Sequence, residues 1–457
     1  MIVSAMICGS PFFLPGDADN IVKYSKLCEK KQEQSFLEKQ ENENKRGALL
    51  YLDGRDSIIW RKDNRKDRKT AMEKTLWEIY NDTQLAELET LTADYKDFLD
   101  AGKTERECVT EVIRLAEKEG YVDLNQKDTL QAGDKVYLDW MGKSIVLFQI
   151  GEDPLENGMN ILGAHVDSPR LDLKQNPLYE ESGFAYFDTH YYGGIKKYQW
   201  VTLPLAIHGV VVKKDGTKFN VVIGEKEEDP IFAITDLLPH LGSKQMEKTA
   251  ASVIEGEALD ILVGSAPLCG EEKDAVVAHI LKLLKETYDI EKEDLMSAEL
   301  EIVPAGKARD CGLDRSMVMA YGQDDRVCAF TSLMAMFHTE NKKRTSCCIL
   351  VDKEEIGSVG ATGMQSRFFE NAVAEILDKC GEFSELKLRR AMANSTMISS
   401  DVGAAFDPMH ADVYDKRSNP FFGKGMVLNK HTGSRGKGGS NDANAEYLSL
   451  IHISEPT

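Results

Sequence analysis

Two adjacent carboxylates, Glu354 and Glu355, follow an apolar run at residues 347–351, and Gly357 comes soon after them. The apolar run predicts a short buried strand that ends at the edge of a sheet. Side chains alternate along an extended chain, so we expect the two carboxylates to point in different directions. One of them could then bind a cation while the other moves a proton. The alternative is an acidic strand end in solvent, and the choice depends on what the rest of the chain supplies.

Three further segments present histidine or carboxylate side chains at the end of a predicted strand or the start of a predicted helix. They contain His165 with Asp167, Asp324 with Asp325, and Asp401. Imidazole and carboxylate suit zinc, and a carboxylate can bridge two cations about 3.5–4 Å apart. Asp167 lies two residues from His165, on the same side of an extended strand, and could orient its imidazole. Together the four segments predict a two-metal site.

The elements that must position these residues alternate between strand and helix. Apolar periodicity predicts helices at residues 77–99, 104–118, 324–338 and 367–379, and strands at 136–140, 144–150, 159–164 and 397–400. From about residue 173 to residue 303 the pattern changes to short strands at 200–207, 209–212 and 220–223, with one helix at 274–288. The sequence therefore predicts an α/β domain interrupted by an inserted, β-rich second domain.

The composition fits a chain of two or three domains with sizeable cores, because it has 457 residues of which 42% are hydrophobic. The net charge of −20 disfavours nucleic acid as a partner. No apolar run approaches the roughly 20 residues that span a bilayer, so we expect no membrane partner. The nine cysteines show no metal-type spacing, and reduced thiols fit a cytoplasmic protein. The glycine-rich segment 432–440 lacks the spacing of a phosphate-binding loop, so we expect no nucleotide site.

Both ends of the chain differ from the rest. Residues 1–71 show no sustained helical periodicity and are dense in charge. We expect them to be an upstream extension or a disordered tail, and we expect the natural protein to start at Met72. The string at 448–457 resembles the translation of a sequencing-library adapter, which predicts that the natural chain continues beyond Tyr447. Between these ends, the predicted site residues lie in two parts of one α/β domain, at 72–172 and 305–447. We expect this catalytic domain to enclose the inserted domain at 173–304.

In their combination and order, these segments resemble metallopeptidase family 18, the family of aspartyl aminopeptidase and vacuolar aminopeptidase I. The resemblance covers residues 72–447 and is closer to the bacterial branch, so a preference for acidic N-terminal residues does not follow. It implies a three-layer α/β/α zinc-exopeptidase-like catalytic domain with an inserted β-rich dimerisation domain. The residues that carry it are 163–170 (GAHVDSPR), 323–326 (QDDR), 353–358 (KEEIGS), 399–403 (SSDVG) and 432–443.

Residue by residue, the resemblance implies a site with two Zn²⁺ ions per subunit. His165 would bind the first ion, Asp324 would bridge both, Glu355 would bind the second and Asp401 would complete the first. Glu354 would be the general base, which takes a proton from the attacking water and passes it to the leaving amine. The family also implies a non-prolyl cis peptide bond after the bridging acid.

One expected ligand is missing from the chain. The family's second metal also takes a histidine from near the C-terminus. His452 lies in the adapter-like string, and His410 and His431 are candidates by residue type only. We therefore expect the second site of this chain to be incomplete.

The resemblance also implies an assembly. The segment 230–240 resembles one whose histidine reaches the active site of a neighbouring subunit, which gives His240 a catalytic role and leaves His208 as a weaker candidate. In the family the inserted domain mediates dimerisation, and the dimers form a tetrahedral dodecamer that admits peptides. The sequence thus predicts a cytoplasmic, homo-oligomeric zinc aminopeptidase that acts on peptides. The alternatives are a related dinuclear-metal amide hydrolase and a catalytically inactive assembly subunit.

Overall fold

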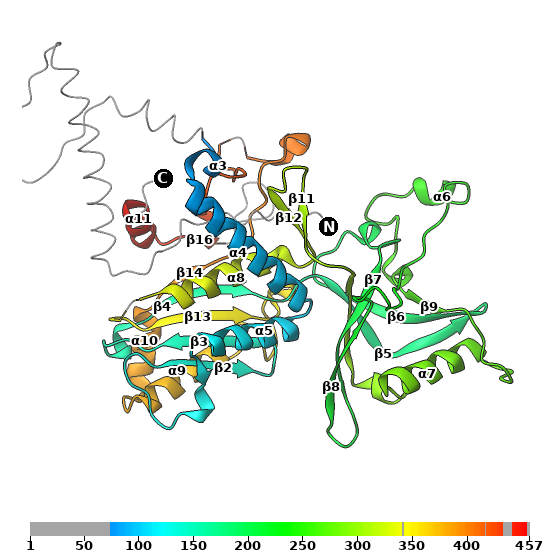
Figure 1. The fold of residues 1–457 in the computed structure, drawn as a ribbon, viewed down its shortest axis with the longest axis horizontal. Coiled ribbons are helices and arrows are strands. Elements are labelled where there is room, and N and C mark those ends of the chain that lie inside the picture. The colour runs from blue at the N-terminus through cyan, green and yellow to red at the C-terminus, as the bar shows by residue number, and fades with distance from the viewer. Residues whose placement is uncertain (1–73, 341, 416, 433–440, 455–457) are drawn as a thin grey trace, which may run out of the picture. The chain divides into compact units, whose positions relative to one another are not determined.

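The computed structural model describes residues 74–340, 342–415, 417–432 and 441–454. These residues form two compact units. The first unit holds residues 91–337 and 342–402 and contains both large sheets (Figure 1). The predictions for residues 1–71 and for most of the glycine-rich segment lie outside the described residues.

The first sheet has six strands and mixes parallel with antiparallel pairing. The predicted hairpin is confirmed, because β2 and β3 pair antiparallel around the turn at residues 141–143. β13, β4 and β14 are parallel neighbours, so their carboxyl ends meet at one edge of the sheet. In sheet order the strands are β1 (Val122–Asp123), β2 (Lys135–Trp140), β3 (Ser144–Gln149), β13 (Ser346–Val351), β4 (Asn160–His165) and β14 (Thr396–Ser399).

Helices cover both faces of this sheet. Cys347, Ile349 and Val351 of β13 pack in one core with apolar side chains of α9 and α10. The remaining residues of β13 are also buried, so they face the opposite side. There α5 contacts β2 and β3, and α8 buries its own apolar side chains. This confirms the predicted three-layer α/β/α arrangement (Figure 1), built from α4 (Asp82–Ala101), α5 (Glu105–Lys118), α8 (Gln323–His338), α9 (Phe368–Lys379) and α10 (Glu385–Asn394).

The second sheet is entirely antiparallel and lies within residues 170–304. Its first strand, β5, pairs with its last, β10, so that Leu171 lies opposite Ile302. Both sheets belong to one compact unit, so the predicted boundaries of the inserted domain stay a prediction. Two helices accompany it, α6 (Ser243–Met246) and α7 (Ala275–Tyr288). In sheet order the strands are β8 (Lys218–Ile223), β7 (Leu205–Val212), β10 (Glu299–Pro304), β5 (Arg170–Glu181), β6 (Phe184–Tyr192) and β9 (Ile261–Gly264).

Several local predictions differ from the structure. Residues 200–203 form turns rather than the start of a strand, because Thr202 has a left-handed φ of 63° and Pro204 follows. β7 instead continues unbroken through Gly209. The structure also contains β5, β6 and α10, which the periodicity does not predict. The helix predicted at 77–99 is divided into α3 (Leu76–Ile79) and α4, since the Asn81 side chain accepts the first free N–H groups of α4.

The two central carboxylates lie on a turn rather than on an extended strand. β13 ends at Val351, Lys353 has a left-handed φ of 74°, and Glu354–Ile356 forms a single turn of 3₁₀ helix. The expected alternation of an extended chain is therefore wrong at this point. The peptide bond between Asp324 and Asp325 is cis, as the resemblance implies.

The described part of the second unit is small. It contains α3, the paired strands β15 (His431–Thr432) and β16 (Asn441–Asp442), and α11 (Ala445–Ser454). His410 and His431 belong to this unit, and their role as ligands stays a prediction. The cysteines of the described ranges are all free. No helix in these ranges is both long enough and apolar enough to cross a membrane.

Candidate metal centre

The carboxyl ends of three parallel strands bring the predicted site residues together. His165 is the last residue of β4, and its side chain is buried. Its Nε2 lies 3.3 Å from Asp324 Oδ1, 3.8 Å from Glu354 Oε2 and 3.9 Å from Asp401 Oδ1. These carboxylates come from the start of α8, from the turn after β13 and from the segment after β14. Four elements that are far apart in the sequence thus meet at one sheet edge.

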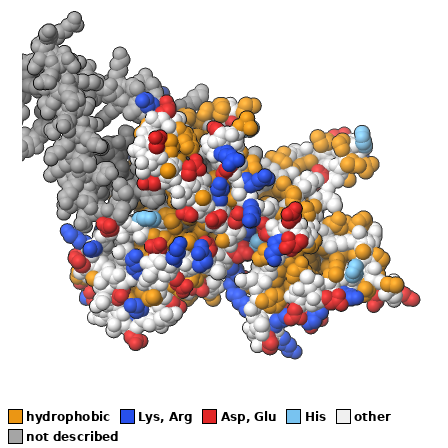
Figure 2. Space-filling model, viewed as in Figure 1, with side chains coloured by type: hydrophobic (Ala, Val, Ile, Leu, Met, Phe, Trp, Pro, Cys, Tyr) orange, Lys and Arg blue, Asp and Glu red, His pale blue; other side chains and the backbone are white. Residues whose placement is uncertain are grey.

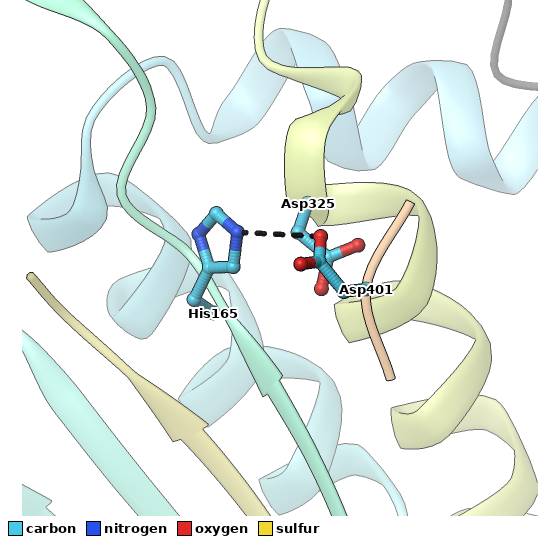
Figure 3. A group of neighbouring side chains, drawn as sticks. All are labelled: His165, Asp325 and Asp401. Carbon is cyan, nitrogen blue, oxygen red and sulfur yellow. Dashed lines mark ion pairs between the residues drawn. The ribbon is translucent and has the colours of Figure 1, made fainter. Parts of the chain in front are cut away.

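Two sets of three side chains have ligand atoms close enough to hold an ion. His165 belongs to both sets, once with Asp324 and Glu355 and once with Asp325 and Asp401, and the atoms of each set lie within 4.8 Å of one another. Figure 3 shows Asp325 and Asp401 together on one side of the His165 imidazole. Asp325 is fully buried and is not among the ligands expected from the sequence. Its position next to Asp324 is the signal that could have found it.

Asp167 links the histidine to the turn that carries the two glutamates. Its Oδ1 lies 3.3 Å from His165 Nδ1, and its backbone carbonyl lies 3.0 Å from the same nitrogen. Its carboxylate oxygens accept the backbone N–H groups of Glu354 and Glu355, each at 3.2 Å. These contacts are made across about 187 residues of sequence, which is why local pattern does not predict the turn. Asp167 is therefore placed to orient both the imidazole and the turn.

Tyr192 is a residue of this site that the sequence reasoning misses. It is the last residue of β6, and its buried hydroxyl donates to Asp167 Oδ2 at 2.7 Å. The Arg170 guanidinium lies over its ring, with Cζ 4.0 Å from the ring centroid. The next residue, Gly193, approaches so closely that a Cβ there would lie 3.2 Å from Glu355 Cβ. The second sheet thus contacts the site directly, and its only sequence signal is the Gly193-Gly194 pair that marks a strand end.

Carboxylate groups crowd this site and shift one another's titration. Burial, together with the negative charge of the neighbouring Asp324, raises the pKa of Glu355 to about 8. Burial also raises the pKa of Asp325 to about 8, and it raises the pKa values of Glu354 and Asp401. For His165, burial lowers the pKa, but hydrogen bonds to Asp167 and Asp324 outweigh it and raise the pKa to about 11.

The donor set fits a divalent cation. Burial and mutual repulsion disfavour the ionised carboxylates more than His165 favours them, and a divalent cation would stabilise the ionised forms. Within the described chain, the buried Nε2 of His165 has no well-aligned hydrogen bond, although Asp324 Oδ1 is close to it. A neutral imidazole could therefore offer this nitrogen to a metal. Imidazole nitrogen and carboxylate oxygen are ligands that zinc takes in proteins.

The two histidines that are candidates for reaching a neighbouring subunit, His240 and His208, differ in accessibility. His240 is exposed between β8 and α6, and its catalytic role stays a prediction. His208 is buried in β7, where its ring nitrogens lie 2.8 Å from Glu107 Oε1 and 3.2 Å from Glu225 Oε1. Because both ring nitrogens are engaged within the chain, the geometry argues against His208 as the residue that reaches a neighbouring subunit.

Comparisons with known proteins agree on one family. A family model described as aminopeptidase I zinc metalloprotease (M18) matches residues 98–454. A probable M18 family aminopeptidase 1 of Clostridium acetobutylicum is 61% identical over 383 residues, which cover 83% of this chain and 82% of the relative. The crystal structure of an M18 family aminopeptidase from Thermotoga maritima is 44% identical, with a TM-score of 0.79 and 83% of each chain covered. That of aminopeptidase I from C. acetobutylicum is 57% identical, with a TM-score of 0.76 and the same coverage.

Proposed function

The chain belongs to the aminopeptidase I zinc metalloprotease (M18) family, and we propose that it releases N-terminal amino acids from peptides with the help of two zinc ions. The observation that supports this most is the convergence of His165, Asp324, Glu355 and Asp401 at one sheet edge. Their residue types match the ligands that zinc takes. They are the four residues that the resemblance assigns to the metals.

His165 and Asp401 would hold the first zinc, Glu355 would hold the second, and Asp324 would contribute to both. The second zinc would also need the C-terminal histidine that the resemblance implies, for which His410 and His431 stay candidates by residue type. Asp325 shares a ligand set with His165 and Asp401, so it is a further candidate ligand for the first zinc. Bound zinc would supply Lewis-acid chemistry that makes water a nucleophile at neutral pH. The chain's own contribution is to hold these side chains in place through Asp167 and the strands.

Glu354 acts as the general base of this proposal. Its side chain is about half exposed, so it can reach both the site and an incoming water molecule. Burial and the neighbouring acids raise its pKa, although the nearby His165 opposes this shift, and a raised pKa makes the carboxylate a stronger base. Glu354 takes the proton of the attacking water and returns it to the leaving amine as the peptide C–N bond breaks.

The proposal is tested by metal analysis together with the hydrolysis of aminoacyl-nitroanilides. We expect bound zinc, hydrolysis that stops when a chelator removes the metal, and recovery when zinc is returned. A protein that hydrolyses these substrates without any metal, or that binds no metal at all, would refute it.

We expect Tyr192→Phe to weaken zinc affinity by about 10–100-fold, as loss of an outer-shell partner of a metal ligand typically does. The variant removes the hydroxyl that donates to Asp167, which in turn orients His165 and the glutamate turn. The measurement is a zinc titration of the apo protein against a competing chelator. Tyr191→Phe is the matched control, because Tyr191 is the preceding residue of β6 and is exposed. Equal zinc affinities in the two variants would contradict the expectation.

We propose that the protein acts as a homo-oligomer, and the resemblance implies a dodecamer. Large apolar side chains are exposed in the second sheet's region, among them Leu237, Leu238 and Leu241. Figure 2 shows hydrophobic side chains gathered over the part of the view where Figure 1 places β5, β6 and α7. Exposed apolar patches of this kind mark interaction surfaces.

Leu238→Asp combined with Leu241→Asp is expected to reduce the assembly to smaller species, because it places charge on an apolar contact surface. Mass photometry or sedimentation velocity measures the change. Leu386→Asp on α10 is the control, since it introduces the same charge at another exposed leucine. An unchanged mass in the double variant would contradict the proposed surface.

A further inference from the structure

A cavity of about 370 Å³ lies beside the candidate metal centre, and no residue role described so far accounts for it. Its walls come from the loop after β4, the turns before β7, the segment after β10 and the start of α8. Asp324, assigned above to the position between the metals, is one of the wall residues. A volume of this size lies within the range of about 300–1,000 Å³ that is usual for small-ligand sites.

Hydrogen bonds hold the cavity walls in place near Asp324. Ser168 Oγ donates to the backbone carbonyl of Asp324 at 2.7 Å. The Tyr321 hydroxyl donates to the backbone carbonyl of Pro169 at 3.1 Å. All four residues line the cavity, and the two bonds tie the loop after β4 to the start of α8. A ligand therefore meets a preformed site, which lowers the entropic cost of binding.

The cavity lining combines apolar surface with two cations. Trp200, Leu203 and Met319 supply apolar side chains, while Lys307 and Arg309 supply positive charge from the segment after β10. Neither cation forms an ion pair within the described ranges. The adjacent acid, Asp310, instead pairs with Lys96 at 2.5 Å and Arg315 at 3.7 Å. Asp100 and Glu225 lie at the same segment but accept the backbone N–H groups of Ala308 and Gly306. In a chain with a net charge of −20, two cations without an ion pair of their own point to an anionic ligand.

We propose that this cavity binds the residue that follows the scissile bond, and that Lys307 and Arg309 bind a carboxylate of that residue. The inference rests on the proposed aminopeptidase function. Two cations repel the protonated α-amine of a substrate, so this amino group does not enter the cavity. The opposite side of the scissile bond can carry the required charge, either as the α-carboxylate of a dipeptide or as an acidic side chain. The planar guanidinium of Arg309 suits a carboxylate in both cases.

The first experiment compares substrates that share one N-terminal residue X, with the intact protein. The substrates are the dipeptide X-Ala, its amide X-Ala-NH₂ and the acidic amide X-Glu-NH₂, and kcat/KM is measured for each. We expect kcat/KM to be at least about tenfold higher for X-Ala than for X-Ala-NH₂, the size of one charged hydrogen bond. A value for X-Glu-NH₂ above that for X-Ala-NH₂ assigns the side-chain carboxylate to the same cations. Equal values for all three overturn the proposal.

The second experiment removes the two cations. Lys307→Met/Arg309→Leu is expected to bring the ratio of the X-Ala and X-Ala-NH₂ rates towards one. Lys214→Met/Lys292→Met is the control, because it removes two exposed lysines that do not line the cavity. A ratio that the first double variant leaves unchanged overturns the proposal.

A nitroanilide assay separates this inference from the proposed function. Nitroanilides carry no carboxylate after the scissile bond, so their hydrolysis reports the aminopeptidase activity alone. If the protein hydrolyses none of the substrates, the proposed aminopeptidase function is refuted. The assignment of the cavity then loses its premise. If Lys307→Met/Arg309→Leu selectively lowers the rate for Glu-nitroanilide relative to Gln-nitroanilide, the cations bind an acidic N-terminal side chain instead, and the assignment to the following residue is wrong.

Discussion

Glu354→Gln is expected to reduce kcat for aminoacyl-nitroanilides by about 10²–10⁴-fold while zinc remains bound. The amide has nearly the same shape as the carboxylate but cannot take the proton of the attacking water. Zinc is retained because the assigned ligands are other residues, namely His165, Asp324, Glu355 and Asp401. Metal content by mass spectrometry and kcat by a continuous nitroanilide assay give the two measurements.

Glu375→Gln is the matched control for this substitution, because Glu375 is an exposed glutamate on α9. It is expected to behave like the unaltered protein in both measurements. A Glu354→Gln variant that keeps kcat within about twofold of the unaltered protein would refute the general-base assignment. Loss of zinc in this variant would instead identify Glu354 as a ligand.

Asp324→Ala is expected to lower zinc affinity by more than about a hundredfold and to abolish hydrolysis. Loss of an outer-shell partner already costs about 10–100-fold, and Asp324 is assigned to contact both ions. Its Oδ1 is also the nearest carboxylate oxygen to His165 Nε2, at 3.3 Å. The remaining acidic side chains would bind fewer zinc ions, so the zinc content per subunit should fall below that of the unaltered protein.

Asp325→Ala distinguishes the two ligand sets that share His165. If Asp324 is the residue between the metals, Asp325→Ala should retain more zinc than Asp324→Ala. The reverse order would assign that position to Asp325, which lies with Asp401 in the second set. Thermal unfolding with excess chelator, measured for both variants, separates a loss of metal from a loss of fold.

The parts of the site that the sequence predicts are those encoded by continuous apolar runs. The residues of β13 are buried on both faces, so every position is apolar or small and the strand is visible in the sequence. His165, Asp401 and the glutamates follow such runs. Because parallel strands end at a common edge, the sequence is enough to predict that these residues meet.

The parts that the sequence does not predict depend on contacts between distant residues. The carboxylate of Asp167 holds the turn at Glu354. Lys353 before it has a left-handed backbone conformation, which its residue type does not predict. β5 mixes charged and apolar residues and contains a proline, while β6 carries aromatic residues at both exposed and buried positions, such as Phe184 and Phe187. Neither strand therefore shows the strict alternation that predicts a half-buried strand. Tyr192 was missed for this reason, since a tyrosine on an unpredicted strand cannot be placed beside Asp167.

The pairing of β5 with β10 has a consequence for how this protein can vary. Leu171 of β5 lies opposite Ile302 of β10. The segment that leaves the first sheet therefore lies beside the segment that returns to it. This strand pair and the hydrogen bond from Ser168 Oγ to the backbone carbonyl of Asp324 both hold the segment of His165 near the start of α8. Tyr192 and Gly193 must keep their contacts with Asp167 and Glu355, but the exposed surfaces of α6 and α7 can change without breaking this pairing. Assembly and chemistry can thus change independently of each other during evolution.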